Sequence, residues 1–408
     1  MERSRTVELL SPAGNPEKLQ AAVLYGADAV YLAGDSFGMR AAAGNFSRPQ
    51  LQDAVTLCKP KGVAIHVTCN TVPRSDELAA LPDYLSFLDG LGVDALIIAD
   101  LGVFRLAQQY APHLKLHIST QAGVASYADA DAWFQLGASR VILARELSLQ
   151  ELATLRQKTD PRLELEAFVH GSMCVSYSGR CLLSSYMTGR DANRGACAQP
   201  CRYEYALVEE KRPGQYWPVF EDEKGTYLMN SKDLCMIDHL AELWDAGLAS
   251  LKLEGRAKSA YYAAVVTGAY RHCLDAVVAG KPLDPAWRDE VDHVSHRRYS
   301  TGFFYGPAEQ YCENSRYIRD WQVNALVTKC DAEGNAVVSV RNKFSTGDTV
   351  EVVGPNLRPF SMTVPALETM DGLPLTEARN PQMLVQLKFP QAVPVDSLVR
   401  HAVEQTAE

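Results

Sequence analysis

Residues 7–34 read VELLSPAGNPEKLQAAVLYGADAVYLAG, and this stretch decides the predicted fold class of the whole chain. Two short apolar runs, VELLSPA (7–13) and AVYLAG (29–34), flank the amphipathic segment PEKLQAAVLYG. The Gly-Ala that follows this segment is typical of a helix end placed just before a strand. The order strand, helix, strand therefore predicts a parallel βαβ unit.

The same alternation continues to about residue 280. Six further strand-like runs are VAIHVTC (63–69), ALIIAD (95–100), LKLHIST (114–120), RVILAR (140–145), LELEAFVH (163–170) and SLKLEG (250–255). Most of their residues are apolar, as expected for strands covered on both faces. Eight strand–helix repeats predict a TIM-like (β/α)₈ barrel over residues 1–280. An open doubly wound sheet is the alternative, but no G-x-G-x-x-G follows the first strand.

The chain changes character after residue 280. Residues 281–320 are predicted to form a linking helical or irregular region. From residue 321 to 408, short alternating runs such as AVVSVRN and TVEVVGPN are separated by turn signals. This pattern predicts a small C-terminal all-β barrel domain of five to seven strands.

One connection in the barrel is unusually long. The seventh strand ends near His170, and the next helix, DLCMIDHLAELWDAG, is predicted to begin near Asp233 with Cys235 in its first turn. The loop over residues 171–235 contains five of the ten cysteines: Cys174, Cys181, Cys197, Cys201 and Cys235. In a parallel barrel this loop lies at the carboxyl-end face, where active sites are built. Loops of this length in compact domains are usually functional or disordered.

The cysteine spacing indicates a metal site without choosing the metal. The five residues are separated by six, fifteen, three and thirty-three residues. This spacing matches neither the paired knuckles of zinc sites nor compact ferredoxin-type runs. Four thiolates suffice either for a Cys₄ zinc site or for a [4Fe–4S] cluster. His170, four residues before Cys174, also allows a Cys–His nucleophile, although no orienting acid is identifiable nearby.

Polar residues follow the predicted strands, where a barrel brings them to one mouth. They include Ser119, Gln121, Arg145, His170, Glu254 and Arg256, with Lys252 inside the last strand and Arg40 in the second loop. The arginines suit a small anionic substrate, because guanidinium groups pair with carboxylates through two parallel hydrogen bonds. Internal ion pairs with Glu146 and Glu254 are the alternative.

Bulk properties limit the function classes. The net charge of −9 argues against a nucleic-acid-binding surface over the whole protein, although it allows a local basic groove. No apolar run reaches about 18 residues, and the first residues lack the apolar core of a signal peptide. These features predict a cytoplasmic protein without a membrane partner. In the cytoplasm disulfides are rare, which again favours metal or redox chemistry for the clustered cysteines.

Several motifs make the chain similar to a known family. ELLSPAGNPEKLQAAVLYGADAVYLAG, RVILARELSL, FVHGSMCVSYSGRCLLSSY, NRGACAQPCRYEY and LKLEGRAKS resemble peptidase family U32, the collagenase-like proteases, over residues 7–310. The chain looks most like the bacterial members that hydroxylate the wobble uridine of tRNA to 5-hydroxyuridine. Their C-terminal β structure resembles RNKFSTGDTVEVVGP in this chain, and we predict a tRNA-binding role for this domain.

The resemblance implies a [4Fe–4S] cluster and prephenate as co-substrate. By motif, the cluster ligands are Cys174, Cys181, Cys197 and Cys235, with Cys201 as the alternative to Cys197. We predict that Arg40, Arg145, Lys252 and Arg256 bind prephenate or tRNA phosphates. Ser119, Gln121, His170 and Glu254 are predicted to be catalytic. The tRNA anticodon loop is the predicted partner, because its bases are easily unstacked; the oligomeric state stays open.

Three other functions stay open at this point. The family name favours a peptidase, for which the sequence offers only the pair His170 and Cys174. Other relatives hydroxylate a ribosomal RNA cytidine or act in ubiquinone synthesis without oxygen. A non-enzymatic iron–sulfur redox protein is the third alternative, but it leaves the polar barrel mouth unexplained.

Overall fold

The fold was analysed in a computed structural model of the chain, which describes residues 7–39, 44–174, 176–203, 206–208, 216–218, 231–309 and 317–403. The chain forms two compact units. The first comprises the residues up to Leu19, Asp28–Ala257 and Arg297–Tyr317; the second comprises Gln20–Ala27, Lys258–His296 and the chain from Ile318. None of the helices in the described residues combines the length and apolar character that crossing a bilayer requires.

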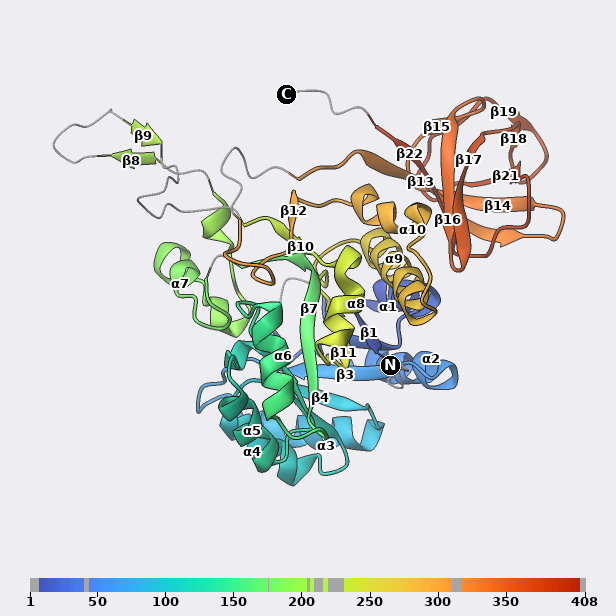
Figure 1. The fold of residues 1–408 in the computed structure, drawn as a ribbon. Coiled ribbons are helices and arrows are strands. Elements are labelled where there is room, and N and C mark those ends of the chain that lie inside the picture. The colour runs from blue at the N-terminus through green and yellow to red at the C-terminus, as the bar shows by residue number, and fades with distance from the viewer. Residues whose placement is uncertain are drawn as a thin grey trace. The chain divides into compact units, whose positions relative to one another are not determined.

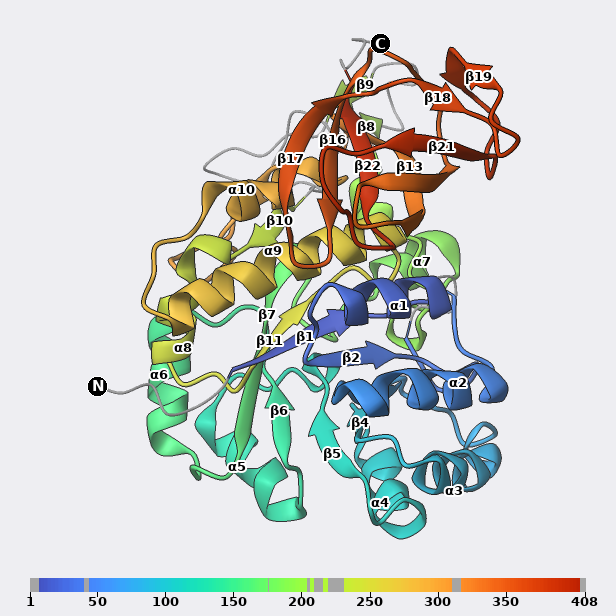
Figure 2. The same cartoon turned by 90° about the vertical axis from the view of Figure 1, so that its right-hand side faces the viewer.

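The first unit contains a closed barrel of eight parallel strands (Figures 1 and 2). They are β1 (Glu8–Pro12), β2 (Ala29–Leu32), β3 (Ala64–Cys69), β4 (Ala95–Ile98), β5 (Lys115–Ile118), β6 (Arg140–Ile142), β7 (Glu164–Ser172) and β11 (Ser250–Leu253). β11 pairs with both β1 and β7, which closes the barrel. The predicted TIM-like barrel is confirmed.

A helix follows each barrel strand in sequence. They are α1 (Pro16–Leu24), α2 (Arg48–Cys58), α3 (Leu81–Leu91), α4 (Leu101–Tyr110), α5 (Tyr127–Leu136), α6 (Leu149–Lys158), α8 (Leu240–Asp245) and α9 (Ala260–Val278). Hydrogen bonds from side chains cap the first turns of several of these helices. Ser47 and Ser148 each form a reciprocal capping box with the residue three positions later, which satisfies backbone N–H groups that the first helical turn leaves without partners.

The start of α8 corrects one prediction. Asp233–Cys235 is not the first turn of a helix but a short strand, β10, which pairs antiparallel with the extended end of β7. The helical segment begins at a 3₁₀ turn, η7 (Ile237–His239). Two interactions override the helical pattern: β12 (Tyr299–Ser300) pairs with β10, and the buried carboxylate of Asp233 accepts hydrogen bonds from Arg297 at 2.7 and 3.1 Å.

The second unit contains the predicted antiparallel β domain. Its eight-stranded sheet consists of β13 (Trp321–Cys330), β14 (Asn335–Val340), β16 (Thr349–Gly354), β17 (Leu357–Thr363), β18 (Leu367–Glu368), β19 (Pro374–Leu375), β21 (Leu384–Lys388) and β22 (Leu398–Ala402). β15 (Phe344–Ser345) pairs with β20 (Glu377–Ala378). Among the described residues the sheet runs in an open order from β17 to β19. There are more strands than predicted, because two-residue strands leave no alternating pattern in a sequence.

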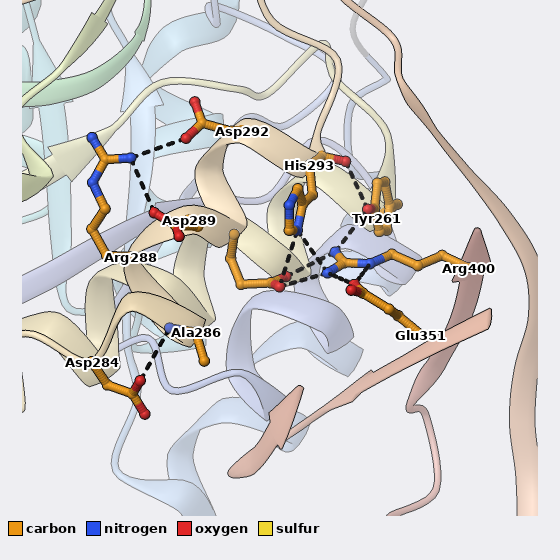
Figure 3. Close-up of polar contacts among 10 residues, drawn as sticks. Tyr261, Asp284, Ala286, Arg288, Asp289, Asp292, His293, Glu351 and Arg400 are labelled. Atoms are coloured by element: carbon orange, nitrogen blue, oxygen red, sulfur yellow. Dashed lines mark hydrogen bonds and ion pairs between the residues drawn. The ribbon is translucent and has the colours of Figure 1, made fainter. Parts of the chain in front are cut away.

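A buried arginine joins the helical and β parts of this second unit (Figure 3). Arg400 of β22 is fully buried, and its guanidinium group binds the Glu290 carboxylate through both terminal nitrogens, at 2.5 and 2.8 Å. It also donates to Glu351 of β16 at 2.9 Å and to the Tyr261 hydroxyl of α9 at 3.0 Å. Residues of the predicted linking region therefore share a buried network with the β sheet.

Candidate functional site

A cavity of about 270 Å³ lies in the loop that follows β7, and four cysteines line it. Cys174 lies two residues after the end of β7, and Cys181 precedes the short helix α7 (Leu183–Thr188). Cys201 lies in the 3₁₀ turn η6 (Pro200–Arg202), and Cys197 lies three residues before this turn. The long loop thus folds back so that thiols far apart in sequence share one cavity.

The thiols of this cavity influence one another. Burial raises the pKa of the Cys174 thiol, and the nearby Cys181 and Cys197 raise it further, while Arg145 opposes them. A tetrahedral zinc ion, with Zn–S bonds of about 2.3 Å, brings its sulfurs to about 3.8 Å from one another. Within the described part of the chain, no three of these sulfurs lie mutually within 4.8 Å. The thiols share one cavity, and among the described residues they do not form a preassembled single-ion site.

Cys235 has a different position from the other predicted ligands. It ends β10 and lies opposite His170 in the antiparallel register with β7. Cys201, rather than Cys235, is among the residues that line the cavity. The cavity thus unites three predicted ligands with the cysteine that the sequence left as an alternative. Which thiols bind a cluster stays a prediction.

A second cavity, of about 100 Å³, adjoins the first and contains most of the predicted polar site. Met39, Thr120, Gln121 and Arg145 line both cavities. The predicted site residues that line the second cavity are Ser119, Gln121, Arg145, Lys252, Glu254 and Arg256. The barrel therefore brings together residues from the ends of β5, β6 and β11. Arg40 lies outside the described residues.

Ser119 and Asn70 fix one wall of the inner cavity. The Ser119 hydroxyl accepts the Gln121 backbone N–H at 3.2 Å and the Asn70 side-chain amide at 3.3 Å. The Asn70 carbonyl oxygen accepts the Met39 backbone N–H at 3.1 Å. These bonds connect the loops after β2, β3 and β5. Asn70, directly after the third strand, was expected at the barrel mouth with the other polar strand ends, but no role was assigned to it.

The two arginines of the inner cavity contact residues of the barrel strands. Arg145 donates to the Ser172 carbonyl at 2.9 Å, and its guanidinium group stacks 3.8 Å from the centre of the Phe168 ring. Arg256 is buried and donates to the Thr68 hydroxyl at 3.3 Å. Glu146 accepts the Ser178 backbone N–H and hydroxyl, so its carboxylate is bonded to the cysteine loop.

Lys252 and Glu254 form hydrogen bonds with side chains of the barrel strands. The buried Lys252 ammonium group donates to Glu166 at 2.8 Å and lies 4.5 Å from the centre of the Tyr31 ring. The Glu254 carboxylate accepts the Tyr31 hydroxyl at 3.2 Å. The positive charge of Lys252 is thus neutralised by Glu166 below the cavity.

Charged residues also fill the barrel interior, where TIM barrels usually contain branched apolar side chains. Arg140 donates to Glu166 at 2.9 Å and to Glu8 at 2.6 Å. Burial opposes the ionisation of Glu166, but Lys252 and Arg140 outweigh it and lower the pKa of this carboxyl. His66 and His117 lie beside this group, and burial lowers both histidine pKa values. These residues were not predicted to belong to the site, because in the sequence they are isolated polar residues inside apolar strands.

His170 lies inside β7, opposite Cys235 in the antiparallel register with β10. Its side chain is buried in β7, and its ring lies 5.4 Å from the ring of Tyr299. It does not line either described cavity, whereas Cys174, four residues later, does. The described geometry therefore does not favour a Cys–His nucleophile.

Fold and site together define a (β/α)₈-barrel protein with a thiol-lined cavity at the carboxyl ends of its strands. The family model of peptidase family U32 matches residues 14–314, and that of the peptidase family U32 C-terminal domain matches residues 319–400. The chain belongs to peptidase family U32.

Curated relatives match most of the chain. It is 36% identical over 400 residues to "tRNA hydroxylation protein P1" of Bacillus subtilis, covering 96% of this chain and 94% of the relative. It is 35% identical over 427 residues to "tRNA hydroxylation protein P" of Escherichia coli, covering 94% of each. It is also 39% identical over 275 residues to the "23S rRNA 5-hydroxycytidine C2501 synthase" of E. coli, covering 67% of this chain and 40% of that protein.

Proposed function

We propose that this protein is a tRNA hydroxylase that forms 5-hydroxyuridine at the wobble position, using a [4Fe–4S] cluster and prephenate. The observation that carries the proposal is the adjoining pair of cavities, one lined by four thiols and the other by arginines, amides and hydroxyls. The names of the two relatives that match the full architecture support tRNA as the substrate.

The cysteine cavity supports the cluster. It brings together thiols that are far apart in the sequence, and four thiolates are the usual ligands of a [4Fe–4S] cluster. Cys174, Cys181 and Cys197 would hold the cluster, with Cys235 as the fourth ligand predicted by motif and Cys201 as the alternative. When bound, such a cluster supplies one-electron transfer or Lewis acidity.

The inner cavity suits the carboxylates of prephenate. Arg145 and Arg256 both line this cavity, so two guanidinium groups are brought to one small polar site. Guanidinium groups bind carboxylates with two parallel hydrogen bonds. Lys252 also lines this cavity, and its ammonium group is held by Glu166.

The same wall offers groups for a uracil base. Gln121 lines both cavities, and a side-chain amide presents a donor and an acceptor to the base edge. Ser119 and Asn70 hold the backbone from which Gln121 projects. Enzymes that modify a base take it out of the stack into such a pocket. Glu254, beside Tyr31, is the carboxylate positioned to exchange a proton there.

Two observations rank the tRNA reaction above its alternatives. The rRNA-modifying relative is matched over only 40% of its length, whereas the tRNA-type relatives are matched nearly throughout. A peptidase needs an activated nucleophile, and His170 is buried against Tyr299 instead of lining the thiol cavity.

The test is nucleoside mass spectrometry of tRNA from a strain that lacks the native gene. Wild-type complementation should restore 5-hydroxyuridine, and Cys181→Ala should not. Cys330→Ala in the β domain is the matched control and should behave as wild type. Unchanged tRNA with the wild-type gene would refute the proposal and favour a redox protein. Iron and sulfide analysis of anaerobically purified protein tests the cluster separately.

A further inference from the structure

The loop around the thiol cavity exposes an unusual set of aromatic and apolar side chains. Tyr186 of α7 is 84% exposed and Tyr203, just after η6, is 53% exposed. Tyr177, which also lines the cavity, is 45% exposed. Leu182 and Met187 are exposed beside them. Apolar and aromatic side chains that cluster on an exposed surface often mark an interaction site, so this surface is a candidate for binding a partner.

The part of the loop that contains these side chains, residues 173–203, has a charge opposite to that of the protein, although residues 171–235 as a whole contain eight basic and eight acidic residues. Residues 173–203 contain four arginines and one aspartate, without lysine or glutamate, whereas the whole chain has a net charge of −9. Arg180 and Arg190 are exposed, and Arg190 also lines the thiol cavity. The single acid, Asp191, accepts the backbone N–H of Asn193. A local positive surface on an acidic protein selects an anionic partner.

One of the tyrosines is held in position by the fold. The Tyr203 hydroxyl donates to the Ala198 carbonyl at 3.0 Å, which fixes its ring on the cysteine loop. α7, which contains Tyr186, packs against η6, which directly precedes Tyr203. Exposed tyrosine rings next to arginines are the combination that binds single-stranded nucleic acid, because every base stacks on an aromatic face and guanidinium groups bind the phosphates.

We propose that this surface, formed by Tyr177, Arg180, Tyr186, Arg190 and Tyr203, binds the unpaired nucleotides next to the target base. The inference rests on the proposed function and assigns to the cysteine loop a role beyond holding a cluster. Bases on either side of the modified one stack on the tyrosines, and their phosphates contact Arg180 and Arg190. The target base is thereby directed into the adjoining cavities.

The test measures binding of a fluorescent anticodon stem-loop RNA to the cluster-containing protein by anisotropy. Tyr186→Ala should weaken binding at least about fivefold, and Tyr186→Phe should retain it, because stacking needs the ring and not the hydroxyl. Tyr110→Ala, at the carboxyl end of α4, is the matched control and should leave binding unchanged.

Salt dependence provides a second measurement. Arg190→Gln should reduce the slope of log Kd against log salt by about 0.7, the value for one phosphate contact on a single strand. The exposed Arg162→Gln, before β7, should leave the slope unchanged. Equal binding by Tyr186→Ala and wild type, equal weakness of the Ala and Phe variants, or an unchanged slope in Arg190→Gln would each overturn the inference.

Failure of this inference is distinguishable from failure of the proposed function. Wild-type protein that makes 5-hydroxyuridine while Tyr186→Ala binds RNA normally refutes the surface alone. Wild-type protein that binds RNA in the predicted manner without making 5-hydroxyuridine refutes the hydroxylase and retains the surface. Iron content and thermal midpoint of each variant should match wild type, because Tyr186 is 84% exposed.

Discussion

The Lys252 ammonium group lies 2.8 Å from the Glu166 carboxylate, and both side chains are buried in the barrel interior. Lys252 looks like a substrate ligand from the sequence, because it precedes a strand end rich in polar residues. It lines the second cavity, and the ion pair also gives it a part in the stability of the barrel interior. Removing one partner of a buried pair leaves the other charge uncompensated, which is strongly destabilising.

We therefore predict that Lys252→Ala lowers the free energy of unfolding by about 3 kcal/mol. Denaturant titration would measure this loss, and the exposed Lys61→Ala is the control, with no measurable change expected. Unaltered stability combined with weakened prephenate binding would return Lys252 to the substrate site.

Arg145 should act differently, because its planar guanidinium group both stacks on Phe168 and faces the shared cavity wall. Arg145→Lys keeps the positive charge but loses the stacking on Phe168 and the bidentate hydrogen bonding to a carboxylate. We expect the KM for prephenate to rise about tenfold while the KM for tRNA stays near the wild-type value. Arg190→Gln should show the reverse pattern, and equal effects of both variants on both substrates would contradict the assignment.

The fourth thiol ligand can be identified by comparing two serine variants. The family motif predicts that Cys235→Ser loses iron and the visible absorption of the cluster, whereas Cys201→Ser retains both. Cys201 nevertheless lines the thiol cavity, and Cys235 lies opposite His170. Iron loss in Cys201→Ser with retention in Cys235→Ser would make the cavity lining, rather than the motif, the guide to the ligands.

The buried histidines predict how stability depends on pH. Burial lowers the pKa of His66 and of His117, so both are neutral in the folded protein, whereas unfolded histidine titrates near pH 6.5. Below that pH the unfolded chain binds more protons, and stability is lost as the pH falls. Each histidine contributes a slope of up to about 1.4 kcal/mol per pH unit.

Denaturant titrations between pH 7.5 and 5 would measure this slope, and the double variant His66→Gln/His117→Gln should flatten it. The interior carboxylates do not interfere in this window. Arg140 keeps the pKa of Glu8 below its ordinary value despite burial, so Glu8 contributes only nearer pH 4. If the free energy of unfolding depends equally steeply on pH in the double variant, groups other than these two histidines cause the dependence.

In the second unit, Arg400→Met should destabilise the β domain by about 3 kcal/mol, because Glu290 is then left buried with fewer partners. Arg358→Ala is a matched control: Arg358 also pairs with an acid, Asp284, but at the surface, so little change is expected. Thermal unfolding of both variants would compare them, and similar midpoints would contradict the prediction.

The sequence allowed the barrel to be predicted because its strands are short apolar runs with regular helical spacing. The strand Asp233–Cys235 was missed because its stability comes from distant partners, Arg297 and the end of β7. The second-cavity residues were predictable from their places after strands. The charged residues of the barrel interior were not predictable from the sequence, because only the closed barrel shows that Glu166 faces Arg140 and Lys252.

The composition of the second unit has a consequence for the order of synthesis. The Tyr25 hydroxyl donates to the carbonyls of Val353 and Asp396, which lie 328 and 371 residues later in the chain. On the ribosome, the carboxyl half of α1 therefore has to wait until these distant residues are made before it reaches its final partners. Fragments that begin after Ala27 lack this early segment, and they would expose the surface it covers.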